Sequence, residues 1–197
     1  MSHHPSDPEL FGLLAREADR QANTISLIAS ENHCSAAVRE ACASVLTDKY
    51  AEGYPGARYY GGCEVADQVE RLAQERALQL FPGMAHANVQ AHSGTSANLA
   101  VLEALAGRGG RIVGMKLSAG GHLSHGYPMS HTGKLYAAEH YGVDPESGLL
   151  RYDEVREVVQ RHRPQVVIAG ASSYPRAIDF ATMRGIADEV GALLLAD

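Results

Sequence analysis

A turn of small and hydroxyl-bearing residues opens a helical stretch in this sequence: Ala91-His-Ser-Gly-Thr-Ser96. Small side chains let the backbone approach an anion, and the N–H groups at the start of a helix point toward it. The hydroxyls of Ser93, Thr95 and Ser96 could add hydrogen bonds. The pattern indicates a phosphate-binding turn, with an ordinary Ser/Thr helix cap as the alternative. No Walker or dinucleotide glycine fingerprint is present to decide between them.

A second turn, over residues 116–126, places two glycines directly before His122. Because these glycines have no side chains, the imidazole can approach a flat ligand closely. A satisfied structural histidine is the alternative, and the sequence leaves both interpretations open. A metal site made of His122, His125 and His131 is not expected, because the carboxylates or cysteines that usually complete such a set are missing.

Two more polar groups follow apolar runs. The turn Ala171-Ser-Ser-Tyr-Pro175 is again rich in hydroxyls, and Asp197 follows the run at residues 192–196. Burial favours the neutral form of an aspartate, so an acid at the end of a buried strand needs a cationic partner or a catalytic role. For Asp197, a helix cap is the alternative interpretation.

These groups are expected to meet at one place. In open α/β sheets, ligands lie outside the carboxyl ends of the strands. An anion-binding turn, a histidine able to stack, hydroxyls and an acid would together suit a planar, phosphorylated, protonated heterocycle. Pyridoxal phosphate is such a molecule, and we expect it as the cofactor.

The apolar periodicity supplies the elements that must position these groups. Helices are predicted at residues 7–23, 36–46, 64–81, 96–106, 152–161 and 180–190. Strands are predicted at residues 87–90, 111–115, 135–138, 165–169 and 192–196. Strands that are apolar throughout and alternate with helices indicate an α/β fold of three layers, α/β/α, with a mostly parallel sheet. Between these elements, residues 49–62 carry four glycines, a proline and four tyrosines, so they favour a functional loop.

Composition excludes some classes of protein. The chain has 197 residues, 45% of them hydrophobic, and a formal net charge of −6. No basic cluster marks a nucleic-acid surface, and no apolar run is long enough to span a membrane. The three cysteines have no C-x-x-C spacing and follow no signal-like start, so we expect reduced thiols and a cytoplasmic location. His3 and His4 are expected in a frayed terminus rather than a metal site.

Longer motifs resemble the serine hydroxymethyltransferase family, in the family's order and spacing. They are Leu27-Ile-Ala-Ser-Glu-Asn32, Lys49-Tyr-Ala-Glu-Gly-Tyr-Pro-Gly56, Arg58-Tyr-Tyr-Gly-Gly-Cys-Glu64, Asn88-Val-Gln90, His92-Ser-Gly94 and Gly120-Gly-His-Leu-Ser-His-Gly126. The resemblance implies the aminotransferase-like fold (fold type I) and a homodimer with shared active sites. It also implies reversible transfer of the serine hydroxymethyl carbon to tetrahydrofolate, which gives glycine and 5,10-methylenetetrahydrofolate.

The resemblance implies a role for individual residues. Those matching the coenzyme site are Ser93, Gly94 and Thr95 at the phosphate, His122 stacked on the ring, Ser172 near the ring and Asp197 at the pyridinium nitrogen. Those matching the substrate site are Ser30 and Tyr60 at the carboxylate, with Tyr50 and Glu52 reaching into the partner subunit's site. Those matching the folate site are Leu117, Gly121, His122 and Leu123. Glu52 would be the acid/base group at the serine hydroxyl, and Arg58 is expected to orient the tyrosines of its loop.

Two groups of the family have no match among these residues. The Schiff-base lysine lies beyond the strand that ends in Asp197, and the substrate-carboxylate arginine lies in a C-terminal domain. The lysines present are Lys49, Lys116 and Lys134, none in that context. We therefore expect a truncated N-terminal half that is inactive alone. Residues 1–48 would be a helical arm and residues 49–197 the first part of the pyridoxal-phosphate-binding large domain. A non-catalytic fragment, either inert or paired with intact subunits, is the alternative.

Overall fold

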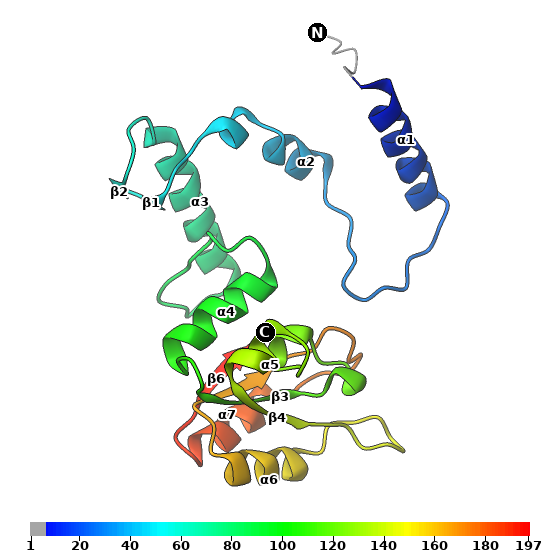
Figure 1. The fold of residues 1–197 in the computed structure, drawn as a ribbon, viewed down its shortest axis with the longest axis vertical. Coiled ribbons are helices and arrows are strands. Elements are labelled where there is room, and N and C mark those ends of the chain that lie inside the picture. The colour runs from blue at the N-terminus through cyan, green and yellow to red at the C-terminus, as the bar shows by residue number, and fades with distance from the viewer. Residues whose placement is uncertain (1–6) are drawn as a thin grey trace. The chain divides into compact units, whose positions relative to one another are not determined.

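A computed structural model describes residues 7–197, in two units that divide between His33 and Cys34. The first unit contains helix α1 (Pro8–Ala22), which begins at Asp7, whose carboxylate accepts a hydrogen bond from the Leu10 N–H at 3.0 Å. Residues 24–33 follow without helix or strand (Figure 1). The predicted helix at residues 7–23 is confirmed, while His3 and His4 lie outside the described residues.

The second unit begins with short elements. Helix α2 (Ala36–Cys42) is followed by the 3-10 helix η1 (Val45–Asp48), the strands β1 (Gly53–Tyr54) and β2 (Ala57–Arg58), and the helix α3 (Glu64–Leu80). The helix predicted at residues 36–46 is shorter than expected, because Ser44 caps a new turn by accepting from the Leu46 N–H at 3.4 Å. The glycine-rich segment, predicted as a loop, forms a hairpin whose antiparallel strands are only two residues long.

The α/β part of the second unit alternates helices and strands. After α4 (Gly94–Leu105) come β3 (Arg111–Met115), the 3-10 helices η2 (Leu117–Ala119) and η3 (Leu123–His125), α5 (His131–Leu135), β4 (Ala137–Tyr141), α6 (Tyr152–His162), β5 (Val166–Ala169), α7 (Phe180–Asp188) and β6 (Leu193–Ala196). The four strands form a parallel sheet in the order β4-β3-β5-β6. The predicted α/β fold with a parallel sheet is confirmed.

The core lies on both faces of this sheet, because successive side chains of a strand point to opposite faces. Helices α6 and α7 lie on one face and α4 on the other (Figure 1). The first face buries Val113, Met115, Val167 and Ala169 against Val155, Val159, Met183 and Ile186. The second buries Ile112, Val166 and Ile168 against Leu102 and Tyr136. Three layers therefore hold the carboxyl ends of β3, β5 and β6 in place.

Two strand predictions need correction. Residues 87–90 form no strand: the Asn88 side chain accepts from the Gln90 N–H at 2.9 Å, a local bond that competes with strand pairing. The strand predicted at residues 135–138 begins later, at Ala137, because Leu135 ends α5 and the Tyr136 N–H donates to Thr132 O at 3.0 Å. The other predicted strands agree with the structure to within one residue at each end.

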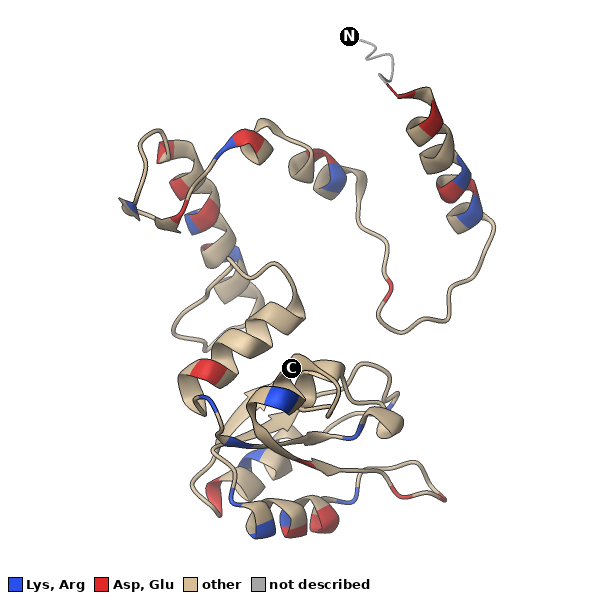
Figure 2. Cartoon of the chain, in the orientation of Figure 1, with Lys and Arg blue, Asp and Glu red and all other residues tan. Residues whose placement is uncertain are grey.

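Charges of both signs are interspersed along α3 and α6 (Figure 2). None of the described helices has the length and apolar character needed to cross a bilayer. Across residues 7–197, no three or more His, Cys, Asp or Glu side chains gather in a way that could hold a metal ion. The proposed boundary between residues 48 and 49 stays a prediction.

Candidate active site

Two loops at the carboxyl edge of the sheet are joined through Gly120. Its carbonyl accepts hydrogen bonds from the N–H groups of Ser172 at 2.8 Å and Ser173 at 3.0 Å. Gly120 has a φ of 105°, and a Cβ added there would lie 2.6 Å from the Tyr174 nitrogen. Only glycine meets both conditions without strain. The turn after β3 and the turn after β5 therefore lie together, as the parallel topology predicts.

Asp197 lies at the same edge, directly after β6, and is held by two side chains. Its Oδ2 accepts from Asn98 Nδ2 at 2.9 Å and from His125 Nε2 at 2.6 Å. The hydrogen bond from His125 is the main cause that lowers the pKa of Asp197, and Asn98 adds to it, while burial opposes them. The side chain stays 33% exposed. Asp197 is thus an anchored carboxylate that can still meet a ligand.

His125 is oriented from both ring nitrogens. Its Nδ1 accepts from the backbone N–H of His122 at 3.3 Å, so the ring proton belongs on Nε2, where it is donated to Asp197. This assignment follows from the hydrogen-bond geometry. The side chain is 1% exposed. A neutral imidazole can make this bond, so no buried positive charge is required.

His122 is held at one nitrogen and partly exposed. Its Nδ1 accepts from the Ser124 N–H at 3.1 Å and lies 2.7 Å from the Ser124 hydroxyl. That hydroxyl in turn accepts from Asn98 Nδ2 at 2.8 Å. The rings of His122 and His125 meet edge-on, with centroids 5.8 Å apart and an angle of 64°. One connected network, the Asp197 cluster, therefore contains His122, Ser124, His125, Asn98 and Asp197.

The first turn of α4 leaves backbone donors open. Ser93 and Ser96 form a capping box, in which Ser96 N–H donates to Ser93 Oγ at 3.3 Å and Ser93 N–H donates to Ser96 Oγ at 3.0 Å. Among the described residues, no group accepts from the N–H of Gly94 or Thr95. The helix-cap interpretation is thus correct for Ser93, and the neighbouring N–H groups remain available to an anion. Asn98 lies one turn further along the same helix face as Gly94.

Sequence reasoning missed three members of the Asp197 cluster. The sequence pattern assigns no role to Ser124 or Asn98, and it suggests His125 only as a member of a metal site that is not expected. All three side chains are buried polar groups, which are rarely retained without a hydrogen-bond partner. A polar Asn98 in a mainly apolar helix was a usable signal, but its partner Asp197, directly after β6, lies 99 residues away in the chain.

The remaining predicted coenzyme and folate residues lie around the same loops. Ser172 is partly buried, and its backbone is fixed by Gly120 as described above. Gly121 is buried, whereas Leu117 and Leu123, which begin η2 and η3, are exposed. The structure therefore brings Ser172 and the predicted folate stretch to the turns that carry His122.

The predicted substrate residues of the hairpin form a separate group. Tyr50 and Tyr60 pack edge-to-face with ring centroids 5.6 Å apart, and Glu52 is exposed. Within the part of the chain that the structure describes, no hydrogen bond or ion pair joins Tyr50, Glu52 or Tyr60 to the Asp197 cluster. Ser30 belongs to the first unit, where it lies in an exposed turn.

Comparison with known proteins settles the family. The family model described as serine hydroxymethyltransferase matches residues 4–197. The chain belongs to the serine hydroxymethyltransferase family. Serine hydroxymethyltransferases of Deinococcus deserti and Coprothermobacter proteolyticus are each 58% identical to it over 191 residues, 97% of this chain. The serine hydroxymethyltransferase of a Synechococcus species is 55% identical over 192 residues, 98% of this chain.

These relatives are longer than the chain. The aligned part covers 47% of the Deinococcus protein, 46% of the Coprothermobacter protein and 44% of the Synechococcus protein. The chain thus spans about half the length of the curated serine hydroxymethyltransferases it matches. The match contains the Asp197 cluster, the first turn of α4 and the hairpin of residues 49–62.

Proposed function

We propose that these residues form the N-terminal half of an enzyme that reversibly transfers the serine hydroxymethyl carbon to tetrahydrofolate, with pyridoxal phosphate as coenzyme. The products are glycine and 5,10-methylenetetrahydrofolate. The observation that carries the proposal is the Asp197 cluster at the carboxyl edge of the sheet, in a chain of the serine hydroxymethyltransferase family. The location would be cytoplasmic, which suits the free thiols of Cys34, Cys42 and Cys63.

The groups present fit the coenzyme. Asp197 offers an anion whose lowered pKa keeps it charged near neutral pH, which suits a protonated ring nitrogen. The N–H groups of Gly94 and Thr95 at the start of α4 suit a phosphate, and the hydroxyls of Ser93 and Thr95 lie beside them. His122 offers a partly exposed aromatic ring. When bound, the coenzyme supplies an electron sink for charge at the substrate α-carbon.

In this proposal Asp197 holds the proton on the ring nitrogen. Both protein donors contact Oδ2, so Oδ1 would be available to a protonated ring nitrogen. Asn98 and His125 keep the carboxylate from rotating, because one holds it from α4 and the other from η3. His122, whose orientation is fixed by Ser124, would stack on the coenzyme ring. Ser172 would contribute a hydroxyl close to it.

The substrate would be handled by the hairpin and by Ser30. Glu52 would hold or accept the proton of the serine hydroxyl, which needs a carboxyl group with access to the substrate. Tyr50 would act beside Glu52 in the partner subunit's site, while Tyr60 and Ser30 would bind the substrate carboxylate. Leu117, Gly121, His122 and Leu123 would contact tetrahydrofolate, whose flat ring system suits the exposed leucines of η2 and η3.

A homodimer with shared active sites accounts for the position of the hairpin residues. Helix α3 has no buried residue, and Val65, Val69 and Leu72 are exposed at helical spacing on it. An apolar stripe of this kind favours burial against another protein surface. A second copy of the protein would cover it and receive Tyr50 and Glu52 in its own active site.

We infer that residues 1–197 alone do not turn over serine. The Lys49 ammonium donates to the Tyr50 and Gly61 carbonyls, each at 3.0 Å. Lys116 and Lys134 are exposed, and neither bonds to a member of the Asp197 cluster within the described residues. No lysine here is therefore placed to anchor the coenzyme covalently.

The test compares a full-length protein carrying this sequence with residues 1–197 alone. The full-length protein should form glycine from serine only with tetrahydrofolate and pyridoxal phosphate, and removal of the coenzyme should abolish turnover. Residues 1–197 should form no glycine, and borohydride treatment with coenzyme should leave Lys49, Lys116 and Lys134 unmodified by mass spectrometry. A full-length protein without this activity would overturn the proposal. Stoichiometric coenzyme on one lysine would overturn the inference about residues 1–197.

A further inference from the structure

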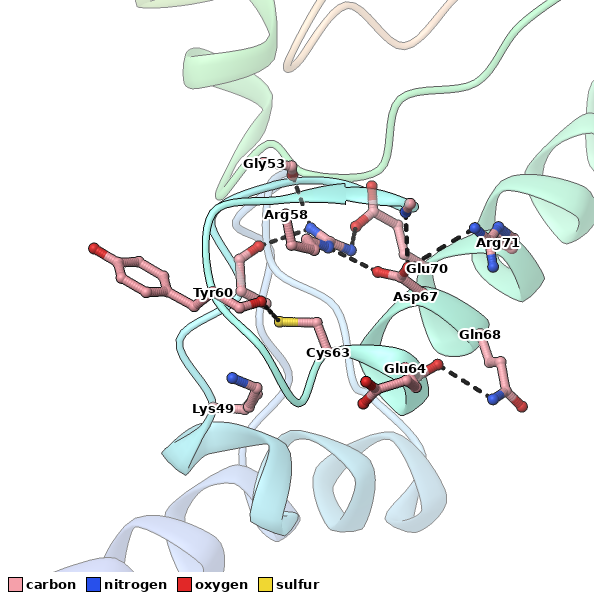
Figure 3. A network of polar contacts seen from close by, with 12 residues as sticks. Lys49, Gly53, Arg58, Tyr60, Cys63, Glu64, Asp67, Gln68, Glu70 and Arg71 are labelled. Atoms are coloured by element: carbon pink, nitrogen blue, oxygen red, sulfur yellow. Dashed lines mark hydrogen bonds and ion pairs between the residues drawn. The ribbon is translucent and has the colours of Figure 1, made fainter.

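Arg58 binds the main chain on both sides of Glu52. Its Nη1 donates to the carbonyl of Ala51 and to the carbonyl of Gly53, each at 2.7 Å. Figure 3 shows the guanidinium lying beneath the hairpin, with a dashed contact to Gly53. The Arg58 side chain is only 6% exposed. The Ala51–Glu52 and Gly53–Tyr54 peptide groups, which lie on either side of Glu52, are therefore both held by one largely buried cation.

The other nitrogens of Arg58 reach two acids on α3. Nε donates to Asp67 Oδ1 at 2.8 Å and Nη2 donates to Glu70 Oε2 at 2.6 Å, and the two acidic side chains are 14% and 12% exposed. Asp67 also accepts from the Gly56 N–H at 2.7 Å, and the Arg58 bond is the main cause that lowers the pKa of Asp67. The hairpin is thus clamped to α3 at its turn and at its strands (Figure 3).

Further hydrogen bonds hold the main chain at Glu52 and Gly53. The Glu52 carbonyl accepts from the Tyr59 N–H at 3.1 Å. Gly53 has a φ of 101° and its carbonyl also accepts from Gln90 Nε2 at 2.9 Å. The Glu52 side chain itself is exposed and extends from this fixed backbone. The sequence predicts that Arg58 orients the tyrosines of its loop. Among the described residues, its hydrogen bonds go instead to the Ala51 and Gly53 carbonyls and to two carboxylates of α3.

We propose that Arg58 is the positioning residue for Glu52, setting where this carboxyl group stands relative to the substrate hydroxyl. The inference rests on the acid/base role proposed above for Glu52. Lysine cannot replace arginine here, because a single ammonium lacks the planar fork that reaches two carbonyls and two carboxylates together. A displacement of about 1 Å at a reacting group can cost about 100-fold in rate. Arg58 thus acts on catalysis without touching the substrate.

The test measures serine cleavage and backbone hydrogen exchange in the full-length holoenzyme. Arg58→Lys should lower kcat by about 10- to 100-fold with little change in the KM for serine. It should also speed hydrogen exchange over residues 49–62, because the clamped carbonyls are released. Arg71→Gln is the matched control, since Arg71 is exposed and contacts Asp67 at 3.8 Å but no carbonyl of the hairpin. It should leave kcat and exchange unchanged.

A double variant separates positioning from general support of the fold. If Arg58 acts through Glu52, Arg58→Lys should lower kcat less than about threefold in a Glu52→Gln background. An undiminished loss there, or unchanged exchange in Arg58→Lys, would overturn the inference while leaving the role of Glu52 intact. A Glu52→Gln enzyme with normal kcat would instead overturn the role of Glu52, and the Arg58 inference with it. If Arg58→Lys does not fold, Glu70→Gln, which weakens the anchor of the guanidinium at Nη2 and so loosens its hold on the hairpin, takes its place in the same cycle with the same expected outcomes.

Discussion

His125 Nε2 lies 2.6 Å from Asp197 Oδ2, although 72 residues separate them in the chain. The imidazole is almost fully buried and the carboxylate is partly exposed, so the pair runs from the protein interior to the surface at the carboxyl edge of the sheet. The backbone of His122 fixes the imidazole from the opposite side. The position of Asp197 is therefore decided by the turn after β3 as much as by its own strand.

Loss of the His125 imidazole should destabilise the fold. His125→Ala leaves the Asp197 carboxylate without its main donor and opens a void in a buried region, and both changes carry a cost. We expect the free energy of unfolding in urea to fall by about 1 to 3 kcal/mol. His131→Ala, at an exposed position on α5, is the control. Equal stability of the two variants would show that the pair does not support the fold.

Acid sensitivity should depend on Asp197. Its pKa is lowered from 3.8 in the folded protein, chiefly by the His125 bond, so its stabilising contribution is present above the unfolded-state pKa and is lost as the pH falls through the lower folded-state pKa. Asp197→Asn cannot titrate and should flatten the fall in unfolding free energy between about pH 5 and pH 3. Urea titrations at several pH values measure this. Asp48→Asn, at an exposed position in η1, should keep the wild-type dependence of unfolding free energy on pH. A steeper fall of the unfolding free energy in Asp197→Asn would contradict the predicted direction of the pKa shift.

Glu52 should matter for chemistry and not for coenzyme binding. Glu52→Gln keeps the size and hydrogen bonding of the side chain but removes its ability to exchange a proton. In the full-length enzyme we expect serine cleavage to slow by about 100- to 10,000-fold, with the affinity for pyridoxal phosphate changed less than twofold. Steady-state kinetics and coenzyme titration measure the two effects. Glu64→Gln, at the exposed start of α3, is the control. Equal losses in rate and coenzyme affinity would argue against an acid/base role.

The apolar stripe on α3 should hold the dimer together. Val69→Lys places a charge in the middle of the stripe of Val65, Val69 and Leu72, where dimer contact would bury it without a partner. The dimer dissociation constant should rise by at least about tenfold, measured by sedimentation of the full-length protein. Arg71→Gln, at an exposed position on another face of the same helix, should leave dissociation unchanged. An unaltered dimer in Val69→Lys would place the interface elsewhere.

Much of the fold could be predicted from local patterns. The apolar runs that became β3, β5 and β6 need no distant information, because a strand buried on both faces must be apolar throughout. The wrong strand prediction at residues 87–90 also has a local origin, because the Asn88 side chain accepts from the backbone N–H of Gln90 and this bond competes with strand pairing in so short a run. The start of β4 was displaced because Tyr136 still belongs to the turn that ends α5.

The sequence by itself determined the α/β fold, the family and the chemical types at the candidate site, because periodicity, turn residues and long motifs are local properties of the chain. Only the tertiary structure decided which polar groups bond to one another. Asn98 in α4, His125 in η3 and Asp197 after β6 lie far apart in sequence and meet at the carboxyl edge of the sheet. Likewise, the sequence predicts that Arg58 acts on the tyrosines of its loop. Its bonds to the carbonyls of Ala51 and Gly53 depend on the packing of the hairpin against α3, which only the tertiary structure shows. Hydrogen-bond partners depend on distance in space, which the order of residues does not specify.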